Sequence, residues 1–426
     1  MLIAAIFCAL LAMICINVPI AVSLAMCGVI GLLVTEGAGS LVTIALDMYD
    51  GSTKFSLIAI PMFVLAGAIM NAGGITDRLI NFVSAIIGFI RGGLAMVNIG
   101  VSLFFAEISG SAVADVAAMG SILIPQMKKR GYSKEFSAAV TSSSASLAII
   151  IPPSIPMILY AASANTSVEQ LFVAGVVPGL LGAAGLMGVA YAFAKRYDYP
   201  VEEAFNLPRI RETFKDAMPA FALPVIILGG IFGGFVTATE AAGLAVFAAL
   251  VVSAWYRNLN LAHLRRAMLD GGIQTAVVML LVAASVLMGG FLTRAQIPQQ
   301  LAEGILSVTA QQWAILLILN FFFLIIGFFL HSAAAIILVV PIVIPLISAA
   351  GIDPVHFGLV VTLNLAIGQQ TPPVASVLIT SCSVARANIW AVSKVNIWFV
   401  SVLLAVLMLC TYVPTVPMFL VEYFYR

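Results

Sequence analysis

The sequence predicts an all-α polytopic membrane protein built as an inverted structural repeat. Three observations support this fold class: the composition, the spacing of the apolar runs, and a set of residues that recurs in the second half of the chain. Of the 426 residues, 62% are hydrophobic and 9% are charged, and the mean hydropathy is +1.15. A soluble domain carries about 25% charged residues, because it presents its surface to water. Lipid is therefore the main solvent here, and we expect a single membrane domain over residues 1–426.

The apolar runs predict about ten membrane spans, two re-entrant helical hairpins and two interfacial arm helices. Two apolar stretches, 95–126 and 312–349, are too long for one span and are interrupted near their middles. Each half has only about 15 residues, too few to cross a bilayer comfortably, so a hairpin that enters and leaves on one side fits better. The predicted spans are residues 2–16, 18–35, 57–72, 134–164, 171–194, 217–235, 238–256, 271–293, 355–381 and 392–420.

The basic residues favour the same topology. If the loop from Lys128 to Lys134 is cytoplasmic, all of the nineteen Lys and Arg except Lys54, Arg294 and Arg426 lie on the cytoplasmic side. This asymmetry follows the positive-inside rule. Residues 1–15 lack the basic start and small-residue cleavage site of a signal peptide, so we expect a retained helix. The prediction is a multi-pass protein of the bacterial inner (cytoplasmic) membrane, with both termini in the periplasm.

An internal repeat divides the chain into residues 1–196 and 217–426. A shift of 220 places Ile124-Pro125 on Ile344-Pro345, and Pro152-Pro153 on Pro372-Pro373. An odd number of spans in each half turns the second copy upside down, an arrangement common in secondary transporters. The segments 76–92 and 297–311 precede the two hairpins and are predicted as arm helices along the interface, with a solvated loop as the alternative.

Four breaks in the apolar segments are candidates for an ion site. Proline pairs interrupt helical hydrogen bonding at 152–153 and 372–373, which leaves backbone carbonyls free to face a hard cation such as Na+. Helix packing is the alternative role for the serines, and helix capping for Asp115. The candidate sodium ligands are Ser109, Ser111, Asp115, Ala148, Ile151, Ser154, Gly327, Gly368 and Thr371.

The two hairpin tips are candidates for anion binding. Half-helices that begin near Gly110 and His331 direct their positive dipole ends toward the centre, which suits a carboxylate. His331 could contact the anion, take up protons, or serve only as a hydrogen-bonded tip residue. The candidate substrate-binding residues are Ser109, Gly110, Ser111, His331, Ser332, Asn364 and Gln370.

Four segments resemble a known family. They are SGSAVADVAAMGSILIPQMKKRGYSKEFSAAV at 109–140, IIIPPSIPMILYA at 149–161, ATEAAG at 238–243 and GQQTPPVAS at 368–376. With the layout of the whole chain, they resemble the large membrane subunit of tripartite ATP-independent periplasmic (TRAP) transporters, within the ion-transporter superfamily. The overall character is similar to the sialic acid group, and members of the family carry C4-dicarboxylates, other carboxylic acids or sialic acid.

The resemblance implies a Na+-coupled elevator-type transporter for a small organic anion. Residues 95–164 and 312–381 would form the moving transport domain, and the remainder the scaffold. Its partners would be a small four-helix membrane subunit, a periplasmic substrate-binding protein and the lipid bilayer. The coupling ion would be Na+, with no organic cofactor.

Three other functions have less support in the sequence. A one-component Na+-coupled carboxylate carrier of the same superfamily is the main alternative. An enzyme is not expected, because no intramembrane His/Asp/Glu cluster, GxSxG or HExxH occurs. A channel is disfavoured by two dead-end hairpins, and a net charge of +1 gives no reason to expect nucleic acid as a partner.

Overall fold

A computed structural model describes residues 2–16, 18–202, 204–258 and 260–425. The side chains of some helical positions, including residues 105–109, lie outside the described part. Within the described residues the regular structure is helical, and the extended pairing is an isolated bridge between Arg91 and Val201. The all-helical prediction is therefore confirmed.

The described residues of the first half of the chain form ten α-helices and two short 3-10 helices. They are α1 (Leu2–Cys15), α2 (Ile20–Glu36), α3 (Ser40–Ser52), η1 (Phe55–Ile58), α4 (Ala59–Ala72), α5 (Ile75–Ile87), α6 (Gly93–Ser109), α7 (Ala112–Lys129), α8 (Lys134–Ala145), η2 (Ser146–Ile149), α9 (Ile155–Ala164) and α10 (Val168–Arg196).

The second half repeats much of this order. Its helices are α11 (Leu207–Phe232), α12 (Ala238–Trp255), α13 (Leu261–Arg294), α14 (Ile297–Val308), α15 (Gln312–Phe329), α16 (Ser332–Ala349), α17 (Pro354–Gly368), α18 (Ser376–Ala385), α19 (Ile389–Tyr412) and α20 (Thr415–Tyr425).

Eight helical segments of the described chain are long and apolar enough to cross a membrane. They include η1 with α4, and α10, α11, α12, α13, α15, α16 and α19. The sequence predicted single spans at 134–164 and 355–381, each with an internal break. In the structure each becomes two shorter helices, α8 with α9 and α17 with α18, separated at the proline pair.

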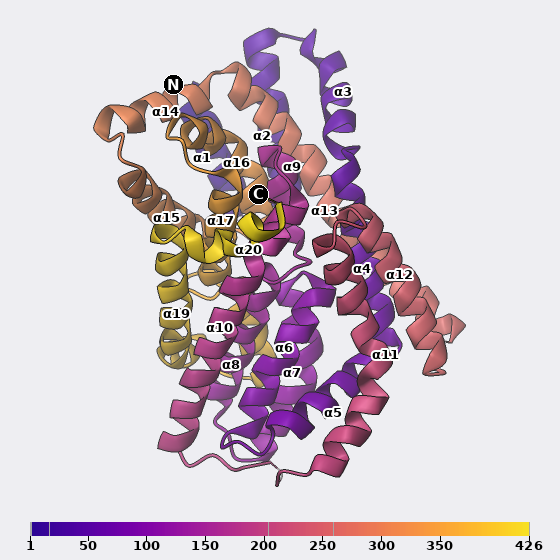
Figure 1. Cartoon of the computed structure of the whole chain (residues 1–426). Coiled ribbons are helices and arrows are strands. Elements are labelled where there is room, and N and C mark those ends of the chain that lie inside the picture. The colour runs from indigo at the N-terminus through magenta and orange to yellow at the C-terminus, as the bar shows by residue number, and fades with distance from the viewer. Residues whose placement is uncertain (1, 17, 203, 259, 426) are drawn as a thin grey trace.

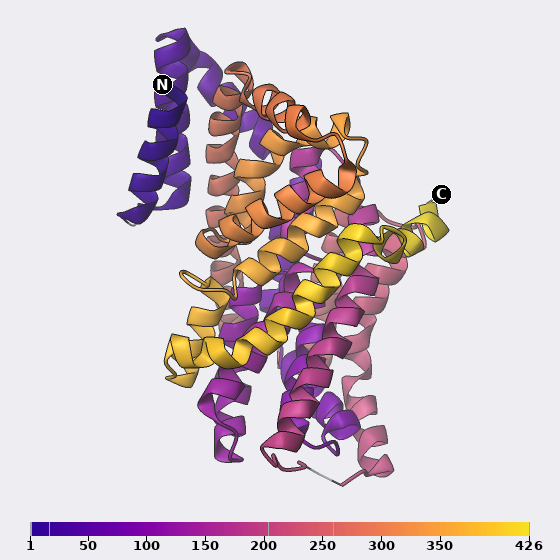
Figure 2. The same cartoon turned by 90° about the vertical axis from the view of Figure 1, so that its left-hand side faces the viewer.

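The helices form two groups. The α13 bundle consists of α1–α5 and α11–α14, in which α13 packs along α2 and α4, and α12 along α4. The hairpin bundle consists of α6–α10 and α15–α20, in which α15 packs along α17, and α8 along α18 and α19. The bundles meet where α13 and α14 contact α16, and where α4 and α5 contact α6 (Figures 1 and 2). Below, the end of the molecule with α3, at the top of Figure 1, is the α3 side, and the end with α5 is the α5 side.

The two predicted arm segments are helices, so the solvated-loop alternative is wrong. One side of α5 is buried, with Leu79 and Phe82 in a cluster that includes residues of α11. Arg78 on α5 fixes the contact: its Nε lies 3.3 Å from Oδ1 of Asp216, and its guanidinium lies 3.8 Å from the centre of the Tyr256 ring. This arm is therefore bound to the α13 bundle, although it leads into the first hairpin.

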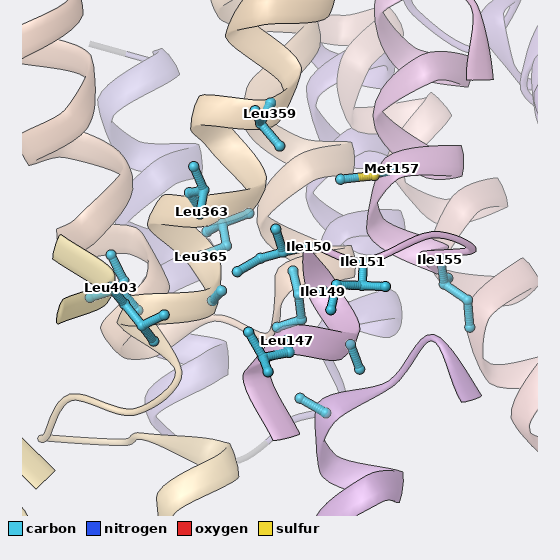
Figure 3. Close-up of a cluster of buried hydrophobic side chains, with 14 of the residues drawn as sticks. Leu147, Ile149, Ile150, Ile151, Ile155, Met157, Leu359, Leu363, Leu365 and Leu403 are labelled. Carbon is cyan, nitrogen blue, oxygen red and sulfur yellow. The ribbon is translucent and has the colours of Figure 1, made fainter. Parts of the chain in front are cut away.

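The largest apolar core surrounds the broken helices. Leu147, Ile149 and Ile150 come from the first break, and Leu359 and Leu363 from α17, and all five are buried (Figure 3). Segments about 200 residues apart in the sequence thus share one core. This packing holds both breaks at the centre of the hairpin bundle.

Candidate functional site

The first hairpin turns at Gly110. Helix α6 ends at Ser109, Gly110 adopts φ 57°, Ser111 is extended, and α7 begins at Ala112. A Cβ at Gly110 would lie 3.2 Å from the amide nitrogen of Ile155 and 3.3 Å from the carbonyl oxygen of Pro153. Glycine is therefore needed for both the positive φ and the close approach to the first break. The side chain of Ser109 lies outside the described residues, so its predicted role is not tested.

The second hairpin turns without a glycine. Helix α15 ends at Phe329, Leu330 and His331 are extended, and α16 begins at Ser332, which is buried. The backbone amides in the first turn of a helix have no partner within the helix, so each tip presents donors at the start of its second half-helix.

The two breaks differ in their local bonds. At the first, Ser154 Oγ donates to the carbonyl oxygen of Ile149 at 2.8 Å. At the second, the amide of Thr371 donates to the carbonyl oxygen of Gly368 at 3.0 Å, and its Oγ1 to that of Ile367 at 3.1 Å. The peptide bond between the paired prolines is cis at both breaks.

A cavity of about 550 Å³ connects both tips to the α13 bundle. The tips contribute Gly110 and Ser111 from one hairpin and His331 and Ser332 from the other. The remaining lining residues are Val64, Ala112, Val113, Ala114, Ala117, Ile149, Ile155, Pro156, Ile273, Gln274, Val277, Val278, Ala333 and Ser376. The two hairpin tips, which occupy symmetric positions in the repeat, therefore line one cavity. We call it the central cavity.

The central cavity has polar groups, and no lysine, arginine or carboxylate is found among its lining residues in the described part of the chain. Its polar side chains are the hydroxyls of Ser111, Ser332 and Ser376, the amide of Gln274 and the imidazole of His331. The N-termini of α7 and α16 reach the same space. Helix dipoles and hydroxyl donors can together hold an anion without a cationic side chain. Most of the remaining lining is apolar, which suits a small organic anion.

Asp115 lies beside this cavity rather than in it. Its side chain is buried, with 1% of the residue exposed, and its backbone amide donates to the carbonyl oxygen of Ser111 at 3.0 Å. It lines a smaller cavity of about 80 Å³ with Asn71 and Gln274. Since Ala114 and Gln274 border both cavities, the carboxylate sits next to the central one.

Two predicted substrate residues are not brought to the central cavity. Asn364 on α17 donates through Nδ2 to Oδ1 of Asn320 on α15, at 2.7 Å. Gln370 donates through Nε2 to Oγ of Ser146 at 2.6 Å and accepts from Oγ of Ser143 at 2.8 Å. These amides join helices to one another, because a buried amide must be hydrogen bonded. The structure therefore places both side chains away from the central cavity, and their assignment to substrate stays a prediction.

The candidate sodium ligands remain a prediction. Gly327 and Gly368 have a separate packing role: a Cβ on Gly368 would lie 2.5 Å from the Cα of Gly327. Helices α15 and α17 therefore touch backbone to backbone. Ala148 and Ile151 are buried at the first break and do not line the central cavity.

The sequence interpretation missed Gln274 and Ser376. Gln274 is a polar residue in the apolar part of α13, and such residues within spans often serve function. Ser376 directly follows the second proline break. The sequence therefore marked both residues as unusual. Their closeness to the hairpin tips could not be predicted, because it depends on how α13 and α18 pack.

The fold and site define a polytopic membrane protein with a small-molecule cavity between two hairpin tips. The chain belongs to the family described as "Tripartite ATP-independent periplasmic transporter, DctM component", whose model matches residues 7–416. Proteins of this family are permease subunits of transporters and not enzymes.

Named relatives come from several bacteria. The C4-dicarboxylate TRAP transporter large permease protein DctM of Pseudomonas aeruginosa is 38% identical over 377 residues, 88% of each chain. The sialic acid TRAP transporter large permease protein SiaM of Vibrio cholerae is 36% identical over 368 residues, 85% of each chain. The isethionate TRAP transporter permease protein DctMQ of Oleidesulfovibrio alaskensis is 38% identical over 408 residues, which are 95% of this chain and 64% of that protein.

A solved structure has a similar fold. The YdaH transporter of Alcanivorax borkumensis superposes with a TM-score of 0.65 at 14% identity, covering 89% of each chain. At this identity the likeness concerns the fold alone.

Proposed function

We propose that this protein is the large permease subunit of a Na+-coupled TRAP transporter that imports a small organic anion. The observation that carries the proposal is the central cavity, lined by both hairpin tips and by the α13 bundle. A site between a pair of broken helices and a second bundle suits alternating access by displacement of one bundle against the other. Membership of the DctM family supports the same function.

The moving unit is proposed to be the elevator domain predicted at 95–164 and 312–381, extended by α10, α19 and α20. Helix α20 is included because it packs along α10. Helix α10 packs on α6, α9 and α17, and α19 packs on α8 and α17. A displacement of the hairpins alone would break these contacts. The remaining helices, α1–α5 and α11–α14, would be the scaffold.

The substrate is proposed to be a carboxylate of the sialic acid or C4-dicarboxylate kind. Relatives named for these two anions support the class. The proposed partners are a small four-helix membrane subunit and a periplasmic substrate-binding protein. A relative named permease protein DctMQ supports the small membrane subunit as a partner, because this chain matches only 64% of that longer protein. A one-component Na+-coupled carboxylate carrier is the alternative.

Sodium coupling is proposed on energetic grounds. Moving one negative charge inward against 100 mV costs about 2.3 kcal/mol, so co-transported cations must offset it. The test is uptake into proteoliposomes by the large and small subunits with the binding protein, using radiolabelled succinate and N-acetylneuraminate. Replacing Na+ by K+ or choline should abolish uptake. Undiminished uptake in sodium-free buffer would refute the coupling, and uptake without the binding protein would favour the one-component carrier.

Both termini are proposed to lie in the periplasm of an inner-membrane protein, with each hairpin returning to the side it entered from. Single cysteines near Gly92 and Met127 should label from the cytoplasm, and cysteines near Gln312 and Ala350 from the periplasm. Labelling of one pair from opposite sides would mean that its hairpin crosses the membrane.

A further inference from the structure

A second cavity lies toward the α3 side of the central one, along the same helices. It has about 130 Å³ and is lined by Gly51, Lys54, Leu57, Leu159, Ala162, Ser163, Val282, Ser285, Val286, Gly289, Ile337 and Pro341. Helices α9, α13 and α16 each line the central cavity first and this one further along their axes toward the α3 side. We call it the α3-side cavity.

Lys54 is the charged residue of the α3-side cavity. It follows α3 and precedes η1, so it belongs to the α13 bundle. Its Nζ donates to the carbonyl oxygen of Ala162, in the last turn of α9, at 2.8 Å. A cation is favourable at a helix C-terminus, where the last carbonyls have no partner within the helix. In this structure Lys54 thus joins the two bundles across the α3-side cavity.

The spacing of the two cavities gives the displacement that would bring the tips to Lys54. On α9, the seven residue steps from Ile155 to Ala162 span roughly 10 Å at about 1.5 Å per step. On α13, the eight residue steps from Val277 to Ser285 span roughly 12 Å. A displacement of about 10 Å therefore lies within the offset of the two cavities on both helices, one from each bundle. A movement of the hairpin bundle by about 10 Å toward the α3 side would therefore place the central cavity opposite Lys54 and Ser285.

We propose that Lys54 is an anion-binding residue of the state displaced toward the α3 side, held on the Ala162 carbonyl in the state described here. The proposal rests on the proposed function, because it needs the bundles to move past each other. Among the described residues, no cationic side chain lines the central cavity, and Gln274 faces the tips instead. The same tips would face an ammonium in one state and an amide in the other. The anion would be captured more strongly on the α3 side and released more readily on the α5 side.

Crosslinking of cysteine pairs by Hg2+ tests the movement of the bundles without a substrate. In a background with the native cysteines replaced, Lys54→Cys is combined with Ala162→Cys or with Ser332→Cys, and Hg2+ is added to membranes that also contain the small subunit. Both pairs should crosslink, because position 54 faces α9 in one state and the second tip in the other. Lys54→Cys with Val277→Cys is the control. These two residues line different cavities of the same α13 bundle, so their separation should not change when the bundles move, and they should not crosslink. Crosslinking of 54 to 162 without any of 54 to 332 would overturn the proposal.

Uptake kinetics test the charge of Lys54 in the protein with its native cysteines. In Lys54→Gln the KM for uptake from the α3 side should rise roughly tenfold, equivalent to about 1.4 kcal/mol of binding, while Lys54→Arg stays close to wild type. Lys394→Gln, on α19, is the control and should leave KM unchanged. The probe is whichever of radiolabelled succinate and N-acetylneuraminate the wild type imports. An unchanged KM in Lys54→Gln would refute the proposal. A wild type that imports neither would instead count against the proposed substrate class, and the crosslinks would still decide the role of position 54.

Discussion

Gly368 gives the sharpest test of packing at the second break. A Cβ at this position would lie 2.5 Å from the Cα, 2.6 Å from the carbonyl carbon and 3.0 Å from the carbonyl oxygen of Gly327. All three atoms are backbone, so α15 must move for Gly368→Ala to fit. Overpacking of this kind costs about 1–3 kcal/mol. Gly327→Ala should cost less, because its Cβ would lie 3.0 Å from the Cα of Gly368 and 3.5 Å from other atoms.

The assay is the thermal unfolding midpoint of the purified protein in detergent, followed by the fluorescence of a thiol dye. An unfolding entropy near 2.1 cal/mol/K per residue makes each kcal/mol worth roughly 1 °C in a chain of this length. Gly368→Ala should therefore lower the midpoint by roughly 1–3 °C. Gly243→Ala is the control, because no atom lies within 4 Å of its added Cβ. An unchanged midpoint in Gly368→Ala would show that the two helices are not held in backbone contact.

Two further predictions concern polar residues of the hairpin bundle. Gln370→Ala should destabilise the protein by about 1–3 kcal/mol, because it removes the two buried hydrogen bonds of its side chain to the hydroxyls of Ser143 and Ser146. The ratio of KM values for different anions should stay the same. A changed ratio with unchanged stability would support the predicted role of Gln370 at the substrate site. Asp115→Ala and Thr371→Ala should each raise the half-saturating sodium concentration roughly five- to hundredfold, from about 1–3 kcal/mol of lost ligation. Ser253→Ala, in α12, is their control, and wild-type sodium curves for both variants would show that they cap or pack rather than bind the ion.

Much of the fold could be predicted from the sequence because the membrane restricts it. The lengths of the apolar runs, together with the glycine and proline residues inside them, located the interrupted helices. Backbone groups that a break frees within the lipid need protein or an ion as a partner, so such breaks are rare and informative. The meeting of Ser111 and Ser332 at one cavity followed from their symmetric positions. The contribution of Gln274 could not be predicted, because it depends on which face of α13 turns toward the tips, and α13 has no clear apolar and polar faces to indicate this.

The position of Asn364, away from the central cavity, has a physical reason. Asn320 and Asn364 form a hydrogen bond between a hairpin arm and a broken helix, and Asn98 on α6 forms the equivalent bond with Ser144 on α8, which donates to Asn98 Oδ1 at 3.2 Å. These residues lie within helices, where the backbone already bonds to itself, so their side chains pair helices. Residues such as Ser111 and Ser332 flank a helix start, where side chain and unbonded amides face the same space. In a broken-helix protein, a polar residue at the start of a half-helix, such as Ser111 or Ser332, is therefore the better candidate for a ligand. A polar residue inside a helix, such as Asn364, is the better candidate for packing.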